Sequence, residues 1–299
     1  MNFFKNFILY SRLHTIIGTT ISVSALYIIS ISISLEPVEY HIAGFILTLI
    51  SCLGANIYIV GLNQITDIEI DKINKPYLPL ASGAYTLKMA YVINTIALLI
   101  SLSIAFYLGK FLLITVLSSL LLGTIYSLPP FRLKRYYFWA AFCIIAVRGI
   151  LVNIFLFLHL HTMVLGYYHL PLSIRLLTAA ILIYSIIIAL FKDIPDMAGD
   201  HKFNIQTLSL RLGSKTVFIL GNSLLAFLFL FLVIIPFFVP FDLNKPIFII
   251  MHILMLVVLL IAAFKTDVKN KGSISKYYQF IWALFFTEYI VFALAALGS

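Results

Sequence analysis

Two short acidic segments contain the residues of this chain whose types and spacing could do chemistry. Residues 63–71 read Asn-Gln-Ile-Thr-Asp-Ile-Glu-Ile-Asp and residues 193–200 read Asp-Ile-Pro-Asp-Met-Ala-Gly-Asp, and together they hold six of the eleven Asp and Glu residues. Residues three, four, seven or eight positions apart share one face of a helix. That spacing relates Asn63, Asp67 and Asp71 in the first segment, and Asp193, Asp196 and Asp200 in the second. We therefore expect two polar stripes that can face each other across a cavity.

The oxygen atoms of these side chains predict a magnesium site. Carboxylates placed close together repel each other unless a cation lies between them, and carboxylate and amide oxygens without His or Cys favour Mg²⁺ over zinc or copper. Mg²⁺ is usually held by a few carboxylates together with substrate phosphates, so the pattern predicts a bound diphosphate. The candidate metal ligands are Asn63, Asp67, Asp71, Asp193, Asp196 and Asp200, of which Asp67, Asp71, Asp196 and Asp200 are also the candidate catalytic residues.

Basic residues flank both acidic segments or lie in loops expected on the same side. A departing diphosphate needs such positive charge around it. The candidate diphosphate-binding residues are Arg12, Lys75, Arg132, Lys134, Lys192, Lys202 and Arg211. The alternative is that the acidic residues form a solvated loop face paired with the neighbouring lysines.

The composition requires that these segments be held by membrane-spanning helices. Of 299 residues, 63% are hydrophobic and 10% are charged, whereas a soluble domain has about 25% charged residues. Nine apolar stretches long enough to cross a bilayer lie near 14–34, 41–66, 87–108, 111–127, 138–158, 172–192, 214–238, 246–264 and 277–297. They do not alternate as barrel strands do. We predict an all-α, polytopic fold, with one domain over residues 1–299 and nine helices around a central cavity open to the side rich in Lys and Arg.

The basic residues define the topology of these spans. Sixteen of the twenty Lys and Arg residues fall in connections on one side, which is the pattern of cytoplasmic loops. The N-terminus is then on that side, as are both acidic segments. The net charge of +9 is explained by topology, and no nucleic-acid-binding signature is present. An ion-coupled transporter is the alternative from another functional class, but its coupling acids are expected near the bilayer midplane on broken helices.

The order of these motifs resembles the UbiA-type intramembrane prenyltransferases. The resemblance rests on Asn63-xxx-Asp67-xxx-Asp71 followed by Asp196-xxx-Asp200, and it covers nearly the whole chain. Within that superfamily, the longer blocks at 56–64, 71–83, 191–196, 206–213 and 280–282 resemble homogentisate prenyltransferases, most of all those that transfer a phytyl group. The resemblance implies nine transmembrane helices and Mg²⁺ as the cofactor. Leu13 departs from the pattern, because proline often stands there.

The resemblance also implies the reaction. An isoprenoid group, with phytyl expected, would pass from its diphosphate to homogentisate with loss of CO₂ and diphosphate, as in tocopherol synthesis. The alternatives are the solanesyl transfer of plastoquinone synthesis, chlorophyll synthase, and 4-hydroxybenzoate polyprenyl transfer. The partners are the two substrates and the lipid bilayer, with no nucleic acid and no protein partner predicted. A cyanobacterial or plastid membrane is expected, with the active site on the cytoplasmic or stromal side.

Four further residues are candidates for binding the acceptor or stabilising a carbocation. Arg148 lies inside a predicted span, where an arginine is costly unless it faces a cavity or pairs with an acid. Asn153 could bond to a substrate hydroxyl or to another helix. Tyr58 and Tyr126 are candidate aromatic walls, because a desolvated aromatic face stabilises a cation by about 2 kcal/mol. Glu288, the acid of the last span, is expected to pair with a basic group or border a cavity.

Overall fold

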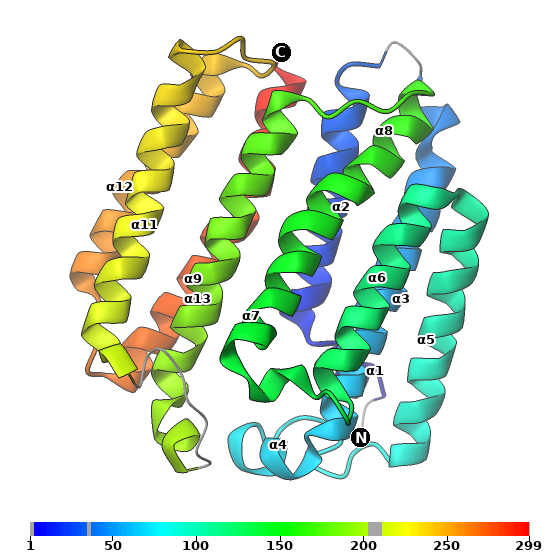
Figure 1. The fold of residues 1–299 in the computed structure, drawn as a ribbon, viewed down its shortest axis with the longest axis vertical. Helices are drawn as coiled ribbons and strands as arrows, with labels where there is room; N and C mark the ends of the chain where they lie inside the picture. Colours follow the sequence, from blue (N-terminus) through cyan, green and yellow to red (C-terminus); the bar gives the residue numbers. More distant parts are fainter. Residues whose placement is uncertain (1–2, 35–36, 203–210, 299) are drawn as a thin grey trace.

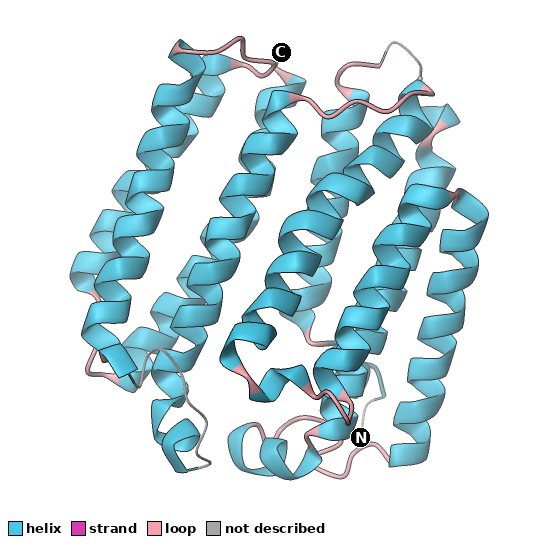
Figure 2. Ribbon diagram, in the orientation of Figure 1, coloured by secondary structure: helices cyan, strands magenta, loops and turns pink. Residues whose placement is uncertain are grey.

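The computed structural model describes residues 3–34, 37–202 and 211–298, without the side chains of residues 38, 137, 193 and 195–202. Every regular element in this part of the chain is helical, as Figure 2 shows. Nine helices in the described residues are long and apolar enough to cross a membrane. The predicted all-α, multi-pass fold is therefore confirmed.

The spanning helices keep the predicted order. They are α2 (Leu13–Ile31), α3 (Ile42–Thr66), α5 (Leu87–Leu108), α6 (Lys110–Ser127), the run of α7 (Tyr137–Ile145), η3 (Ala146–Leu156) and α8 (Phe157–Leu165), α9 (Leu172–Lys202), α11 (Ser214–Ile234) with η4 (Ile235–Phe237), α12 (Lys245–Lys265) and α13 (Lys271–Leu297). The short elements between them are α1 (Phe3–Ser11), η1 (Val38–Tyr40), α4 (Ile68–Asn74) and η2 (Leu133–Arg135).

The fifth and ninth spans are longer than predicted, and the ninth begins at Lys271. The sixth span keeps its predicted bounds of 172–192, but its helix extends beyond them. The fifth continues to Leu165 because His159 is buried and its Nε2 lies 2.9 Å from Thr48 Oγ1 on α3, so the helix has a polar partner beyond residue 158. The sixth helix continues through Pro195 to Lys202, although a proline there predicts a break. A proline removes only one backbone donor, so a helix can continue past it.

Figure 1 shows the spanning helices running along the long axis of the molecule, with the N-terminus at one end and the C-terminus at the other. An odd number of spans produces this arrangement. Helices α1 and α4 and the C-terminal end of α9 lie at the end that carries the N-terminus. We call this the basic end, because the connections rich in Lys and Arg gather there.

Small and polar residues hold neighbouring spans together. Ser51 Oγ on α3 donates to Ser101 O on α5 at 2.8 Å, and Ser101 Oγ donates back to Ser51 O at 2.7 Å. A Cβ at Gly54 would lie 2.9 Å from Ala97 O, so the two backbones approach closely there. Such contacts drive helix association in lipid, where apolar burial alone gives little preference. Helices α9 and α13 are the most buried spans, at 61% each against 22% for α12, so they lie at the centre.

Candidate active site

The first acidic segment is divided by a break in the helix. Helix α3 ends at Thr66, Asp67 has φ −117° and ψ 17°, and α4 begins at Ile68. The prediction that Asn63, Asp67 and Asp71 lie on one continuous helical face is therefore wrong. The Asp67 side chain makes no capping hydrogen bond to α4, and its carboxylate is held instead by basic residues distant in the chain. The break leaves half-buried Asn63 on α3 and places Asp71 on α4.

Asp67 pairs with two basic residues from the connection between α6 and α7. Its Oδ1 lies 2.7 Å from Lys134 Nζ and 3.1 Å from Arg132 Nη2. Both cations also bond to Thr66, since Lys134 Nζ donates to Thr66 Oγ1 at 2.8 Å and Arg132 Nη2 donates to Thr66 O at 3.2 Å. Thr66 was not predicted as a site residue, although its position beside Asp67 was the available signal.

Asp71 is a buried carboxylate with an oxygen that lacks a partner. The residue is 5% exposed, and Oδ2 makes no hydrogen bond to any described residue. Burial raises the pKa of this carboxyl, and the charge of Asp67 raises it further, while Arg12, Lys75 and Lys134 oppose the shift. Burial also lowers the pKa of Lys134, and the hydrogen bond from Lys134 to Asp67 opposes that shift. The two acids and the three cations thus share one electrostatic environment.

Two arginines of this environment have a strained backbone. Arg12 has φ 51° and Arg132 has φ 40°, and they are the only non-glycine residues with positive φ in the described part of the chain. Residues other than glycine reach this left-handed region at a cost of about 1–2 kcal/mol, and such strain concentrates at functional sites. Both arginines were predicted to bind diphosphate.

Arg148 lies on the ring of Trp282 within the bundle. Its Cζ is 4.6 Å from the centroid of the indole ring, and the ring of His14 meets the same indole edge-on at 5.6 Å between centroids. Arg148 is half-buried and makes no ion pair with a described residue. Tyr126, a predicted wall residue, is half-buried and interacts electrostatically with Arg148. This arrangement is a cation held on an aromatic platform.

The carboxylate cluster and the Arg148 platform are neighbours. Arg12 and Lys75 interact electrostatically with Asp71, and the same two cations interact with His14 at the edge of the platform. His14 also interacts with Arg148. The acidic cluster and Arg148, which has no anionic partner among the described residues, are therefore linked electrostatically through Arg12, Lys75 and His14.

The other predicted residues lie in different surroundings. The Asn153 amide is buried and used in hydrogen bonds to the protein, and the Tyr58 hydroxyl lies 3.0 Å from Thr124 Oγ1. Lys192 and Arg211 are exposed. Residues 193–202 are helical in the last turns of α9, as the spacing of the second motif predicts. The side chains of Asp193, Asp196, Asp200 and Lys202 lie outside the described part.

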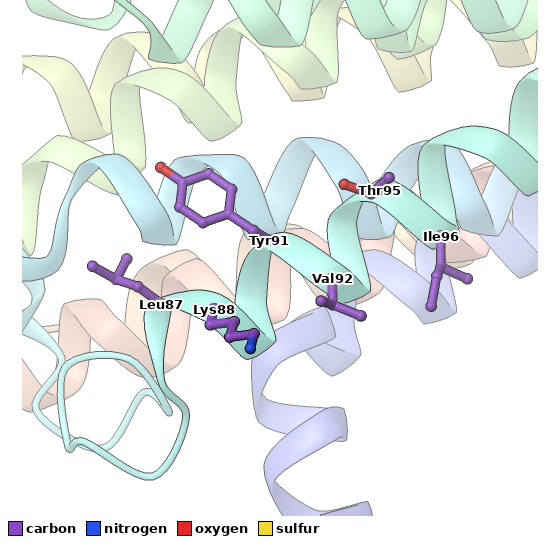
Figure 3. Close-up of a pocket in the computed structure, with 6 residues that line it drawn as sticks. All are labelled: Leu87, Lys88, Tyr91, Val92, Thr95 and Ile96. Atoms are coloured by element: carbon purple, nitrogen blue, oxygen red, sulfur yellow. The ribbon is translucent and has the colours of Figure 1, made fainter.

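A surface groove of about 600 Å³ lies away from this cluster. Figure 3 shows its lining, which comes from the first turns of α5 alone: Leu87, Lys88, Tyr91, Val92, Thr95 and Ile96. Tyr91 and Val92 are 55% and 51% exposed, so the groove is a shallow trough on the outer face of one helix. It contains no acidic residue and no predicted site residue.

Glu288 is a second buried acid, far along α13 from the basic end. Its Oε1 lies 3.3 Å from His252 Nε2 on α12, and both side chains are 0% exposed. The expectation that Glu288 pairs with a basic group is thus confirmed.

The fold and this cluster define a multi-pass membrane enzyme with a polar site near one end of a helical bundle. Residues 23–284 match the model of the UbiA prenyltransferase family. The chain belongs to that family, and it is a prenyltransferase.

The chain is also similar to individual proteins of known function and structure. The chain is 42% identical to a homogentisate phytyltransferase of Synechocystis sp., over 96% of this chain and 94% of the relative. It is 38% identical to homogentisate phytyltransferase 1, chloroplastic, of Arabidopsis thaliana, over 94% of this chain and 73% of the relative. A UbiA homolog from Archaeoglobus fulgidus, solved with GPP and Mg²⁺, has a TM-score of 0.64 over 98% of this chain and all of that chain; at 16% identity the likeness concerns the fold.

Proposed function

We propose that this prenyltransferase transfers a phytyl group from phytyl diphosphate to homogentisate, releasing diphosphate and CO₂. The observation that carries the proposal is the position of Arg148 on its aromatic platform, next to the cluster of Asp67 and Asp71. The cluster of Asp67 and Asp71 suits the binding of a diphosphate through a cation, and Arg148 suits the binding of a carboxylate on an aromatic ring. The names of the relatives at 42% and 38% identity support the same pair of substrates.

The acidic side chains fit a divalent cation. The unpartnered, buried Oδ2 of Asp71 beside the like charge of Asp67 is the arrangement that a bound cation would satisfy. Asn63, Asp67 and Asp71 would hold Mg²⁺ with Asp193, Asp196 and Asp200 from the end of α9. When bound, Mg²⁺ supplies positive charge that stabilises the leaving diphosphate. The homolog from Archaeoglobus fulgidus was solved with Mg²⁺ bound, which supports this choice of metal.

The basic residues would bind the diphosphate oxygens. Arg132 and Lys134 are paired with Asp67 in the described arrangement, so a bound diphosphate would draw these two cations away from that carboxylate. Arg12 has a strained backbone that fixes its position at the start of α2. The proposed diphosphate-binding set is Arg12, Lys75, Arg132, Lys134, Lys192, Lys202 and Arg211.

The reaction breaks one bond at the diphosphate and forms one at the acceptor ring. The allylic C–O bond breaks and its electron pair leaves with the diphosphate, which these cations stabilise. A ring carbon of homogentisate bonds to the allylic carbon and releases its proton. The carboxyl group leaves as CO₂ and a proton takes its place. Arg148 would orient the carboxylate, and Tyr58 and Tyr126 would face the cationic carbon.

Other tails and acceptors remain alternatives. Enzymes named for geranylgeranyl and solanesyl transfer to homogentisate are also relatives of this chain. Chlorophyll synthase and 4-hydroxybenzoate polyprenyltransferase keep the same diphosphate chemistry with another acceptor. We place the site on the cytoplasmic or stromal side, because the connections at the basic end carry most of the Lys and Arg.

A substrate panel tests the proposal. Purified protein is given Mg²⁺, homogentisate labelled in its carboxyl carbon, and phytyl, geranylgeranyl or solanesyl diphosphate in parallel. We expect labelled CO₂ and extractable prenylated quinol, with the highest kcat/KM for phytyl diphosphate. Preference for solanesyl diphosphate would assign the protein to plastoquinone synthesis. Turnover only with chlorophyllide or 4-hydroxybenzoate would overturn the proposed acceptor. No Mg²⁺-dependent turnover with any pair of substrates would contradict the metal-dependent reaction.

A further inference from the structure

We infer that Tyr289 is a positioning residue, which acts through Asn153 to hold the helical turn that presents Arg148 to the acceptor carboxylate. The inference rests on the role proposed for Arg148 above. It concerns the hydrogen bonds that hold the backbone of Arg148, although Tyr289 also interacts electrostatically with Arg148 itself.

Arg148 lies in an unusual stretch of backbone. Residues Ala146–Leu156 form a π-helix between two α-helices of the same span. Such wide turns are rare, occur mostly as single-turn bulges, and often lie at functional sites. An eleven-residue π-helix with an arginine in it needs support from side chains around it.

Asn153 supplies part of that support from within the turn. Its Nδ2 donates to Arg148 O at 2.8 Å and to Gly149 O at 2.9 Å. The side chain is 0% exposed, so these bonds are made in a dry interior. The Asn153 amide therefore holds the backbone carbonyl of Arg148, and the side chain of Arg148 lies on Trp282.

Tyr289 fixes the orientation of that amide. The Tyr289 hydroxyl donates to Asn153 Oδ1 at 2.8 Å, and Tyr289 is 1% exposed. If the amide were flipped, its oxygen would face two carbonyl oxygens, so this orientation follows from the partners. Without the hydroxyl, Oδ1 would be a buried acceptor with no described donor, and the clamp would be free to move.

Helix α13 thus contacts the Arg148 turn at two points. Trp282 and Tyr289 are seven residues apart, which is two helical turns, so they lie on one face of α13. One holds the guanidinium and the other holds the backbone carbonyl through Asn153. On the side of α9 the turn packs closely, because a Cβ at Gly149 would lie 2.2 Å from Leu182 Cδ2.

The test is the hydroxyl deletion Tyr289→Phe with a matched control. The control is Tyr277→Phe, which removes another tyrosine hydroxyl from α13. That hydroxyl donates to Asn222 Oδ1 on α11, so it also forms a Tyr–Asn pair. We expect Tyr289→Phe to raise the KM for homogentisate about fivefold, the worth of one hydrogen bond. The KM for phytyl diphosphate and the homogentisate KM of Tyr277→Phe should stay unchanged.

A double-mutant cycle separates positioning from general loosening of the fold. If Tyr289 acts through Arg148, Tyr289→Phe should have no further effect on the homogentisate KM in an Arg148→Ala background. An undiminished effect in that background, or an unchanged KM in the single variant, would overturn the inference.

A fluorescence measurement keeps the inference distinct from the proposed function. The chain has two tryptophans, so in a Trp139→Phe background emission reports on Trp282 alone. We expect Tyr289→Phe to shift that emission because Arg148 moves on the ring, and Tyr277→Phe to leave it unchanged. If the wild type failed to use homogentisate but the shift were present, the proposed acceptor would be wrong and the positioning contact would stand; no shift would overturn the contact itself.

Discussion

Asp71 and Glu288 are both buried acids with one oxygen that lacks a hydrogen bond in the described part of the protein, yet their surroundings differ. Asp71 lies at the basic end beside another carboxylate, and Arg12, Lys75 and Lys134 surround it. Glu288 lies within a span, with its Oε1 3.3 Å from His252 Nε2 and with Tyr184 as a further neighbour. Burial is therefore common to both, and the charge around each acid is what distinguishes them.

This difference separates a ligand-binding acid from a structural one. Two carboxylates among several cations are stable together only when charge is balanced, and an incoming metal and diphosphate would change that balance. A single acid hydrogen-bonded to a histidine between two helices links those helices and needs no ligand. We therefore propose that the reaction takes place at Asp71 and that Glu288 holds α13 against α12.

The largest expected effect comes from removing the charge at the basic end. Asp71→Asn keeps the size of the side chain but removes a metal-binding charge. We expect kcat/KM to fall by about 10³-fold, and raising the Mg²⁺ concentration should not restore it. Product formation from phytyl diphosphate and homogentisate measures this, and a variant that kept a tenth of the wild-type rate would contradict the assignment.

The next effect concerns the platform beside the acids. Arg148→Ala should raise the KM for homogentisate about 30-fold, because a charge-assisted hydrogen bond contributes about 2 kcal/mol. The KM for the diphosphate should remain within about twofold, since phosphate-binding residues are unaltered. Initial rates over both substrate concentrations check this. A larger change in the KM for the diphosphate than in the KM for homogentisate would show that Arg148 binds the diphosphate instead.

A smaller effect is expected on stability. Burial raises the pKa of Asp71 in the folded protein, so this carboxyl contributes stability at low pH that is lost as the pH rises through the raised pKa. In EDTA at neutral pH, Asp71→Asn should therefore unfold at a temperature about 3 °C above the wild type. At a pH below the carboxyl's unfolded pKa the two midpoints should converge. A lower midpoint for the variant at neutral pH would mean that the charged form is favoured in the fold.

The smallest expected effect is that of Glu288→Gln. The glutamine amide offers both a donor and an acceptor, so it can keep a hydrogen bond to His252 Nε2 in either tautomer of the ring. Both KM values and kcat should therefore stay within about twofold. The midpoint of thermal unfolding should fall by only about 2 °C. Loss of turnover with a normal unfolding profile would give Glu288 a part in the reaction.

The sequence predicts the spans and the basic end well, because hydropathy and charge act over whole helices. It does not predict the break at Asp67 or the π-helix around Arg148. Both depend on partners distant in the chain, since Arg132 lies 65 residues from Asp67 and Tyr289 lies 136 residues from Asn153. Only the fold brings these pairs together. The left-handed backbone of Arg12 is likewise not predicted, because its residue type does not favour positive φ.

A Mg²⁺ titration of turnover on the wild type, Asp71→Asn and Glu288→Gln tests the central claim most directly. All three are assayed with phytyl diphosphate and homogentisate in one detergent. We predict the same half-saturating Mg²⁺ concentration for the wild type and Glu288→Gln, and no saturable response for Asp71→Asn. A normal titration by Asp71→Asn, or loss of the Mg²⁺ response in Glu288→Gln, would contradict the placement of the reaction at the basic end.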